Sequence, residues 1–195
     1  QWLRGQGYQP GVVSRGYGGT AQGCVSVQPA SSPAEVGDEP LLMARRNLCP
    51  VWIGKDRAAT AQTALQAHPQ CDVVLCDDGL QHYRLQRDVE VAVIDGARGF
   101  GNGFMLPAGP LREPVARLQT VDAVVVNSGE TSTDRYAMRL SGEIFHNLLD
   151  PGKTVGASHF HTLSNHAVAG IGHPQRYFRH LQTLGIPFTP HAFPD

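Results

Sequence analysis

The sequence has no run of eighteen apolar residues, so we expect no segment that crosses a membrane as a helix. It also has no charged start followed by an apolar stretch and a cleavage site, which argues against a secretory signal peptide. An excess of charge of either sign is missing too, because the formal net charge is −1. A nearly neutral chain gives no support to bulk nucleic-acid binding.

Cysteine and lysine are both scarce. The four cysteines form no C-x-x-C pair, and Cys76 stands inside an apolar run, so we expect reduced, buried thiols and a cytosolic environment. Fourteen of the sixteen basic residues are arginines, which bind phosphate and carboxylate groups through two parallel hydrogen bonds. Codon bias in a GC-rich genome would produce the same excess, so arginine content alone does not establish phosphate binding.

The remaining composition is that of an ordinary globular protein, with 195 residues, 41% of them apolar and 17% charged. This length suits one α/β domain, or one domain and the start of a second. The chain opens with "QWLRGQGY", which has the pattern of a helix tail stopped by glycine, and it stops at "HAFPD" without a polar tail. We therefore expect both ends to be cut.

Short runs rich in Val and Ile alternate with helical stretches, as in consecutive βα units. Strands with apolar residues at successive positions, such as "DAVVVN", are usually covered on both faces. We predict a mostly parallel sheet with helices on both faces in residues 1–155, and the start of a smaller α/β subdomain in residues 156–195. Strands are expected at 10–14, 24–27, 50–54, 71–76, 89–95, 122–127 and 166–172, and helices at 38–46, 56–68, 113–119 and 174–185.

An acidic pair, Asp77 and Asp78, follows the apolar run "DVVLC" directly. In open α/β sheets ligands bind beyond the carboxyl ends of the strands, and carboxylates there often hold Mg²⁺. Asp-Gly is also a common turn pair, and aspartate is a common helix N-cap. The motif alone leaves both interpretations open.

A second acidic pair, Asp38 and Glu39, stands in "VGDEPLLMARR". Its simplest interpretation makes Asp38 a helix N-cap with Pro40 in the first turn. A carboxylate at a junction between a loop and a helix can also act as the general base for a hydroxyl nucleophile.

Two glycine-rich stretches carry arginines. Glycine lets backbone N–H groups approach a phosphate, and Arg15 in "SRGYGG" and Arg112 in "AGPLREP" could supply positive charge, although either could be a plain surface arginine. The stretch "VAVIDGARGFGNG" suggests a dinucleotide-binding turn, but it lacks the G-x-G-x-x-G spacing and a proline-rich segment follows it. A Rossmann-type cofactor is therefore disfavoured.

Histidines cluster in the last third of the chain. On the predicted spacing, His159 and His161 would share one face of a strand, as a zinc-binding pair does. No cysteine or acidic partner stands at a fixed distance, so surface or hydrogen-bonded histidines are the favoured interpretation. The others in this region include His166, His173 and His180.

Long signatures, above all "DDGLQHYRL" and "LPAGPLREP", together with "SRGYGG", "VGDEPLLMARR", "VWIGKDR" and "HAVAGIGHPQRYF", closely resemble the tetraacyldisaccharide 4'-kinase family of Gram-negative bacteria. The resemblance covers almost the whole chain and is weakest across residues 128–165. It implies a P-loop NTPase fold. It also implies an enzyme associated with the cytoplasmic face of the inner membrane. The implied reaction moves the γ-phosphate of ATP to the 4'-hydroxyl of a tetraacylated disaccharide 1-phosphate, a lipid A precursor.

The same resemblance assigns roles to the acidic residues. Asp77 and Asp78 would serve Mg²⁺ directly or through water, and Gln81 would assist them. Asp38 would be the general base that takes the proton from the sugar hydroxyl. Glu39 would lie beside it near the metal. Such a site suits phosphoryl transfer, which needs mainly positioning and charge neutralisation.

The resemblance also assigns the basic residues. Arg112 would steady the phosphates, while Arg15 and Tyr17 would lie near the acceptor's sugar phosphate, with Arg57 on the same surface. Two family features are missing from the chain, namely a phosphate-binding loop of the type G-G-x-G-K-T-P upstream and histidines after "FPD". We therefore predict that these 195 residues alone have no kinase activity.

Three alternatives remain open at this point. The first is another P-loop kinase or ligase with a different acceptor. The second is a binding or scaffold domain that kept the fold after losing catalysis. The last is a metal-dependent hydrolase built on the histidines.

Overall fold

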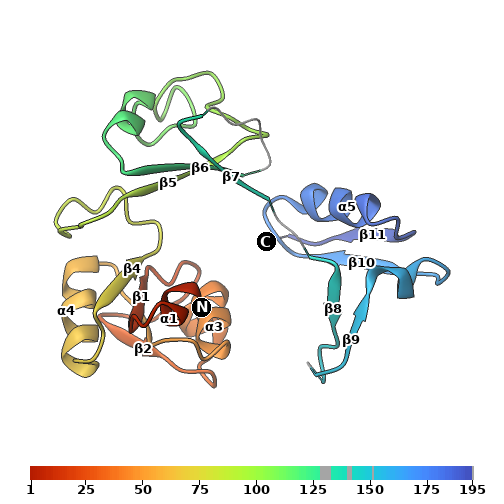
Figure 1. Ribbon diagram of the computed structural model, residues 1–195, viewed down its shortest axis with the longest axis horizontal. Coiled ribbons are helices and arrows are strands. Elements are labelled where there is room, and N and C mark those ends of the chain that lie inside the picture. Colours follow the sequence, from red (N-terminus) through yellow and green to blue (C-terminus); the bar gives the residue numbers. More distant parts are fainter. Residues whose placement is uncertain (128–132, 140–141, 151, 195) are drawn as a thin grey trace. The chain divides into compact units, whose positions relative to one another are not determined.

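A computed structural model of the chain describes residues 1–127, 133–139, 142–150 and 152–194 (Figure 1). The chain divides into two compact units. The first contains Gln1–Ile94 and Arg98–Val126, and the second contains Asp95–Ala97 and Ala137–Asp195. The predicted domain boundary at residue 155 stays a prediction.

The first unit is built on a four-stranded sheet in the order β2-β3-β1-β4. Strands β3, β1 and β4 run parallel, so that Val12 of β1 lies between Val51 of β3 and Leu75 of β4, while β2 is antiparallel to β3. The mostly parallel sheet is therefore confirmed. The strands span Pro10–Ser14 (β1), Val25–Val27 (β2), Val51–Ile53 (β3) and Val73–Cys76 (β4).

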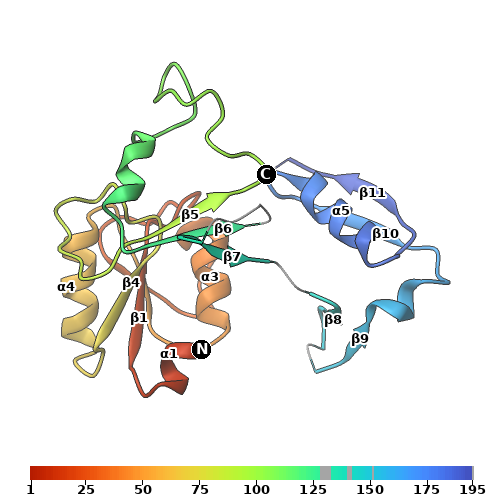
Figure 2. The ribbon, with the colours of Figure 1, turned by 45° about the horizontal axis from the view of Figure 1, so that its top comes forward.

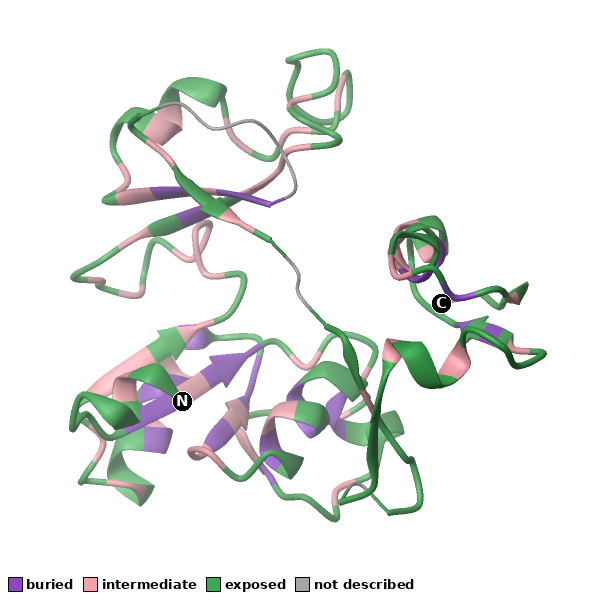
Figure 3. Cartoon of the chain, turned by 45° about the vertical axis from the view of Figure 1, so that its right-hand side comes forward, coloured by how far each residue is buried: buried purple, intermediate pink, exposed green. Residues whose placement is uncertain are grey.

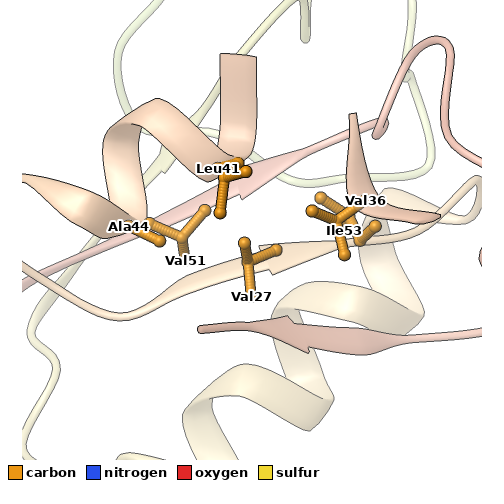
Figure 4. Packing of buried hydrophobic residues seen from close by; sticks show 6 residues of the cluster. All are labelled: Val27, Val36, Leu41, Ala44, Val51 and Ile53. Carbon is orange, nitrogen blue, oxygen red and sulfur yellow. The ribbon is translucent and has the colours of Figure 1, made fainter. Parts of the chain in front are cut away.

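One face of this sheet is covered by helix α3, Asp38–Arg45, with the short helix α2, Pro33–Val36, before it. Figure 4 shows side chains of the two helices meeting side chains of β2 and β3. Removing these apolar groups from water is the main source of stability for the packing. The buried cluster consists of Val27, Val36, Leu41, Ala44, Val51 and Ile53.

Helix α4, Arg57–Ala67, covers the opposite face (Figure 2). Successive side chains of a strand point to opposite faces, so Trp52 points away from the buried Val51 and Ile53 and meets the ring of His68 at the end of α4. Asp56 caps the start of α4, because its carboxylate accepts hydrogen bonds from the N–H groups of Ala58 and Ala59.

Strand β4, expected from an apolar run, is only partly buried. It is the last strand in the sheet order, and Leu75 is exposed while Val73 and Val74 are only partly buried. The four cysteines are free thiols and each is partly buried. Helix α1, Trp2–Gly5, opens the chain and donates a hydrogen bond from Arg4 to the carbonyl of Leu48.

A second sheet contains three strands in the order β5-β6-β7. They span Val91–Asp95, Ala123–Asn127 and Tyr136–Met138. Val91 and Val93 are exposed, whereas Val124 and Val126 are buried. The helix predicted at 113–119 is a 3-10 helix, η1, Val115–Gln119. Pro114 precedes it with an extended backbone, so the helical segment starts only at Val115.

The second unit contains a βαβ arrangement in which β10, His166–Ala169, and β11, Thr189–Ala192, are parallel and helix α5, Pro174–Thr183, connects them. Its buried cluster joins both strand and helix, with Ala167, Phe178 and Leu181 among its members. The helix predicted at 174–185 starts at Pro174 as expected and ends at Thr183, shortly before Gly185 with its positive φ.

An antiparallel hairpin of β8, Ile144–His146, and β9, Thr154–Gly156, precedes this arrangement. Its residues are mostly exposed (Figure 3), and the sequence did not predict it. The 3-10 helix η2, Ala157–Phe160, follows. Across the described ranges, no helix is both long and apolar enough to cross a membrane.

Candidate active site

The carboxyl ends of the three parallel strands come together in the first unit. After β3, the N–H of Gly54 donates to the carbonyl of Ser14 (3.1 Å), and after β4 the N–H of Asp77 donates to the carbonyl of Val13 (3.0 Å). The hydroxyl of Ser14, which is 4% exposed, donates to Oδ2 of Asp77 at 3.0 Å. One oxygen of Asp77 is therefore held by β1, at the edge where open α/β sheets bind ligands.

Asp78 has a different partner from its neighbour. Its φ of 49° lies in the left-handed region, which turns the chain sharply after Asp77. Arg112 donates two hydrogen bonds to the Asp78 carboxylate, one of them from Nη1 to Oδ2 at 2.9 Å. These bonds hold the pKa of Asp78 below its ordinary value. Arg112 and Asp78, predicted on separate motifs, are thus brought together.

Gln81 binds the residue after Arg112. Its Nε2 donates to Oε1 of Glu113 at 2.6 Å, while its Oε1 is buried and has no hydrogen-bond partner within the part of the chain that the structure describes. Glu113 also accepts from the hydroxyl of Tyr83 at 2.9 Å. Burial alone would raise the pKa of Glu113, but the hydrogen bonds from Gln81 and Tyr83, with the charge of Arg117, hold it below its ordinary value.

Arg57 lies inside the protein, not on the surface where it was expected. Only 1% of it is exposed, and its Nη1 donates to the carbonyl of Gly54. Arg57 also lowers the pKa of His82, after burial as the main cause, and Arg15 acts in the same direction. Burial raises the pKa of the Cys76 thiol on the same side of the sheet. Arg57 therefore places a buried positive charge close to Asp78 and His82, at the carboxyl ends of the parallel strands.

Asp38 is not the N-cap of its helix, which corrects the simpler interpretation of its motif. Gly37, with φ 85°, occupies the cap, and Asp38 is the first helical residue, with Pro40 two positions further. Asp38 and Glu39 are both exposed, and Oδ1 of Asp38 accepts from the N–H of Glu39 at 3.0 Å. An exposed carboxylate at this junction remains available as a base.

The glycine loop that carries Arg15 and Tyr17 packs against this junction through its backbone. A Cβ on Gly37 would lie 2.6 Å from the carbonyl oxygen of Tyr17, so only glycine fits there. The N–H of Ala21 donates to the carbonyl of Glu35 at 2.9 Å. Arg15 and Tyr17 themselves are exposed. The loop that follows Ser14 at the end of β1 therefore packs against the chain just before α3.

The histidine cluster does not have its predicted form. His159 lies in the 3-10 helix η2 and His161 at its end, so they do not share a strand face. His161 pairs with the carbonyl of Leu184, and His166 with His191 at 2.9 Å. Within the described ranges, no group of three or more His, Cys, Asp or Glu side chains is placed to hold a metal ion.

Sequence reasoning overlooked Ser14 and Glu113. A signal for each was available, because Ser14 ends the first apolar strand and Glu113 adjoins Arg112 inside "LPAGPLREP". Neither residue type indicates its partner without the fold. The partners of both, Asp77 for Ser14 and Gln81 for Glu113, are far away in the sequence and meet them only in the folded structure.

Known proteins resemble this chain over its whole length. It is 49% identical over 199 residues to a tetraacyldisaccharide 4'-kinase of Azoarcus sp. (strain BH72), covering 99% of this chain and 58% of that protein. It is 50% identical over 196 residues to the protein of that name from Nitrosococcus oceani, covering 100% and 57%. The chain thus spans less than two thirds of the length of these curated relatives.

A solved structure has the same fold. The crystal structure of LpxK from Aquifex aeolicus in complex with ATP superposes with a TM-score of 0.78 at 27% identity, covering 97% of this chain and 63% of that one. This likeness confirms the expected α/β fold of a P-loop kinase. The family described as tetraacyldisaccharide-1-P 4'-kinase (LpxK) matches residues 1–195, and the chain belongs to that family.

Proposed function

We propose that the full-length protein containing these residues is an ATP-dependent kinase that phosphorylates the 4'-hydroxyl of tetraacyldisaccharide 1-phosphate in lipid A biosynthesis. The observation that carries this proposal is the Asp77-Asp78 pair at the end of β4, with Asp78 bound by Arg112. Family membership supplies the acceptor, since the relatives bear the name of that reaction.

The residues at this edge fit a bound Mg²⁺. Mg²⁺ prefers oxygen ligands, and the edge offers the carboxylates of Asp77 and Asp78 together with the orphaned, buried Oε1 of Gln81. In our proposal these three side chains hold the ion, and ATP is the phosphate donor. The ion would neutralise phosphate charge as it develops.

The remaining assignments follow from position and charge. Asp38, exposed at the start of α3, would accept the proton of the acceptor hydroxyl, and Glu39 would lie close to the metal. Arg112 would stabilise the transferring phosphoryl group while holding Asp78. Its side chain is 55% exposed, so a phosphate can reach it from solvent.

The acceptor side of the site is proposed to use the exposed Arg15 and Tyr17. Arg57 is a poorer direct ligand because it is buried, and a role through the charge that it places near His82 and Asp78 fits its location better. Because the proposed acceptor is a lipid, the enzyme is proposed to work at a membrane surface, namely the cytoplasmic face of the bacterial inner membrane that the family resemblance implies.

The test is transfer of labelled γ-phosphate from ATP by the full-length protein. We expect labelling of tetraacyldisaccharide 1-phosphate that requires Mg²⁺ and that other hydroxyl acceptors do not compete away. Efficient competition by a small-molecule acceptor would favour a different P-loop kinase or ligase. Absence of Mg²⁺-dependent ATP binding would favour the scaffold interpretation.

We also propose that the 195 residues alone are inactive, since they include no segment with the pattern G-G-x-G-K-T. The isolated segment should show no transfer in the same assay. Measurable ATP-dependent labelling by the segment would refute this.

A further inference from the structure

Arg112 and Glu113, adjacent in sequence, hold two parts of one turn. Arg112 binds Asp78, and Glu113 binds Gln81 and Tyr83. We propose that Glu113 is a positioning residue that fixes the amide of Gln81 so that its oxygen, not its nitrogen, faces the cation. This proposal rests on the proposed function, because the cation is the Mg²⁺ of that site.

The orientation of the Gln81 amide follows from the chemistry of its partner. An ionised carboxylate only accepts hydrogen bonds, so the group that contacts Oε1 of Glu113 at 2.6 Å is the NH₂ of Gln81. The amide oxygen must then point the other way, where it is buried without a partner among the described residues. A buried amide oxygen without a partner lowers the stability of the fold unless a ligand, such as a cation, binds to it.

Glu113 is itself held from the other side by Arg117. Nε of Arg117 lies 3.1 Å from Oε2 of Glu113, and the side chain of Glu113 is only 15% exposed. The rest of the Arg117 guanidinium donates to Glu90 at 2.7 Å and to Thr120 at 2.6 Å. Guanidinium has no acceptor atom, so the atom of residue 113 beside Arg117 has to be an oxygen.

This constraint predicts an unusual outcome for Glu113→Gln. The new amide must keep its oxygen beside Arg117 and therefore turns its NH₂ toward Gln81. Two NH₂ groups cannot bond, so the Gln81 amide flips and presents its own NH₂ where its oxygen had been. The variant keeps the size of the side chain but replaces an oxygen ligand with a donor.

The experiment is Mn²⁺ binding to the full-length protein, followed by electron paramagnetic resonance with a non-hydrolysable ATP analogue present. We expect Glu113→Gln to weaken Mn²⁺ binding by about tenfold or more, the usual effect of losing an outer partner of a metal ligand. Tyr83→Phe is the matched control, because it removes a hydrogen bond to Glu113 and leaves the Gln81 contact intact. Its Mn²⁺ affinity should equal that of the parent.

A swapped pair gives the sharper test. In the double variant Gln81→Glu with Glu113→Gln, the amide at 113 donates to one oxygen at 81 and the second oxygen faces the cation again. Mn²⁺ binding should recover relative to Glu113→Gln alone.

Parent-like Mn²⁺ affinity in Glu113→Gln would overturn the proposal, as would failure of the swap to restore binding. A parent that binds no Mn²⁺ would overturn it as well, since Gln81 would then face no cation. A parent that binds Mn²⁺ but does not phosphorylate the lipid would refute the proposed function only, and the variants would still decide the role of Glu113.

Discussion

Asp77 and Asp78 are neighbours with opposite surroundings. The left-handed backbone at Asp78 sends its side chain to an arginine, while Asp77 stays within reach of the Ser14 hydroxyl. A single residue step therefore gives one carboxylate a neutral donor and the other a full positive charge. Changes at the two positions should have different consequences.

Ser14→Ala tests the neutral contact. Removing the hydroxyl leaves the buried end of β1 without its bond to Asp77, and we expect the free energy of unfolding to fall by about 1 kcal/mol. Urea denaturation of parent and variant measures the difference. Unchanged stability would mean that water replaces the hydroxyl without cost.

Asp78→Asn tests the charged contact. The side chain of Asp78 is 51% exposed, so we expect the free energy of unfolding to change by less than about 1 kcal/mol. Phosphate transfer by the full-length protein should fall by roughly tenfold to a hundredfold if Asp78 serves the metal. A large loss of stability with little loss of transfer would instead assign Asp78 a structural role.

At the scale of elements, the junction between the glycine loop and α3 depends on backbone contact. Gly37→Ala should destabilise the protein by about 1–3 kcal/mol, because Gly37 has a φ of 85° and its Cβ would meet the carbonyl of Tyr17. Gly18→Ala is the matched control, since Gly18 has a φ of 77° but open space around it. Equal losses in thermal unfolding would show that close approach contributes nothing.

The cap of α4 makes a prediction about pH. Hydrogen bonds, first from the N–H of Ala59, hold the pKa of Asp56 below its ordinary value. A depressed pKa means that the ionised cap stabilises the fold above the pKa of the unfolded chain and loses this effect as pH falls through the folded value. The melting temperature of Asp56→Asn should therefore be lower than that of the parent at pH 7, and the difference between the two should disappear in acid, below about pH 4. A gap that is constant with pH would contradict this.

Elements with a strong apolar pattern could be predicted from the sequence. The strands at 10–14 and 122–127 and the helices at 38–46 and 174–185 have nearly their expected bounds, because their periodicity is local. The hairpin β8-β9 could not be predicted, since its two short strands are mostly exposed and lack the buried Val and Ile residues that mark the equally short β2 and β3. The helix expected at 113–119 is a 3-10 helix over 115–119, which starts only after the extended backbone of Pro114.

The candidate site was only partly predictable. Motifs and the family resemblance named Asp78, Arg112 and Gln81, but the pairing of Asp78 with Arg112, 34 positions apart, depends on how the intervening chain folds back. The burial of Arg57 was missed because arginine is usually exposed and only tertiary contact shows otherwise. Glu113 was overlooked because its proposed role depends on its contacts with Gln81 and Arg117, and no spacing in the sequence indicates those contacts.

At the scale of the whole molecule, the carboxyl edge of a parallel sheet is proposed to carry the metal and base side of a lipid kinase. The chain covers 58% of its Azoarcus relative, so the complete reaction is proposed for the full-length protein and not for these residues alone. The decisive residue is Asp38, because it is proposed to act on the acceptor itself and shares no described contact with the Asp78-Arg112 pair.

The most direct measurement is ³¹P NMR of the lipid product formed from ATP by the full-length parent and by Asp38→Asn. We predict a new phosphate at the 4' position with the parent, and loss of that product in Asp38→Asn by roughly a hundredfold or more, as expected for a general base. Parent-like formation of the product by Asp38→Asn, or a phosphate at another position, would contradict the account.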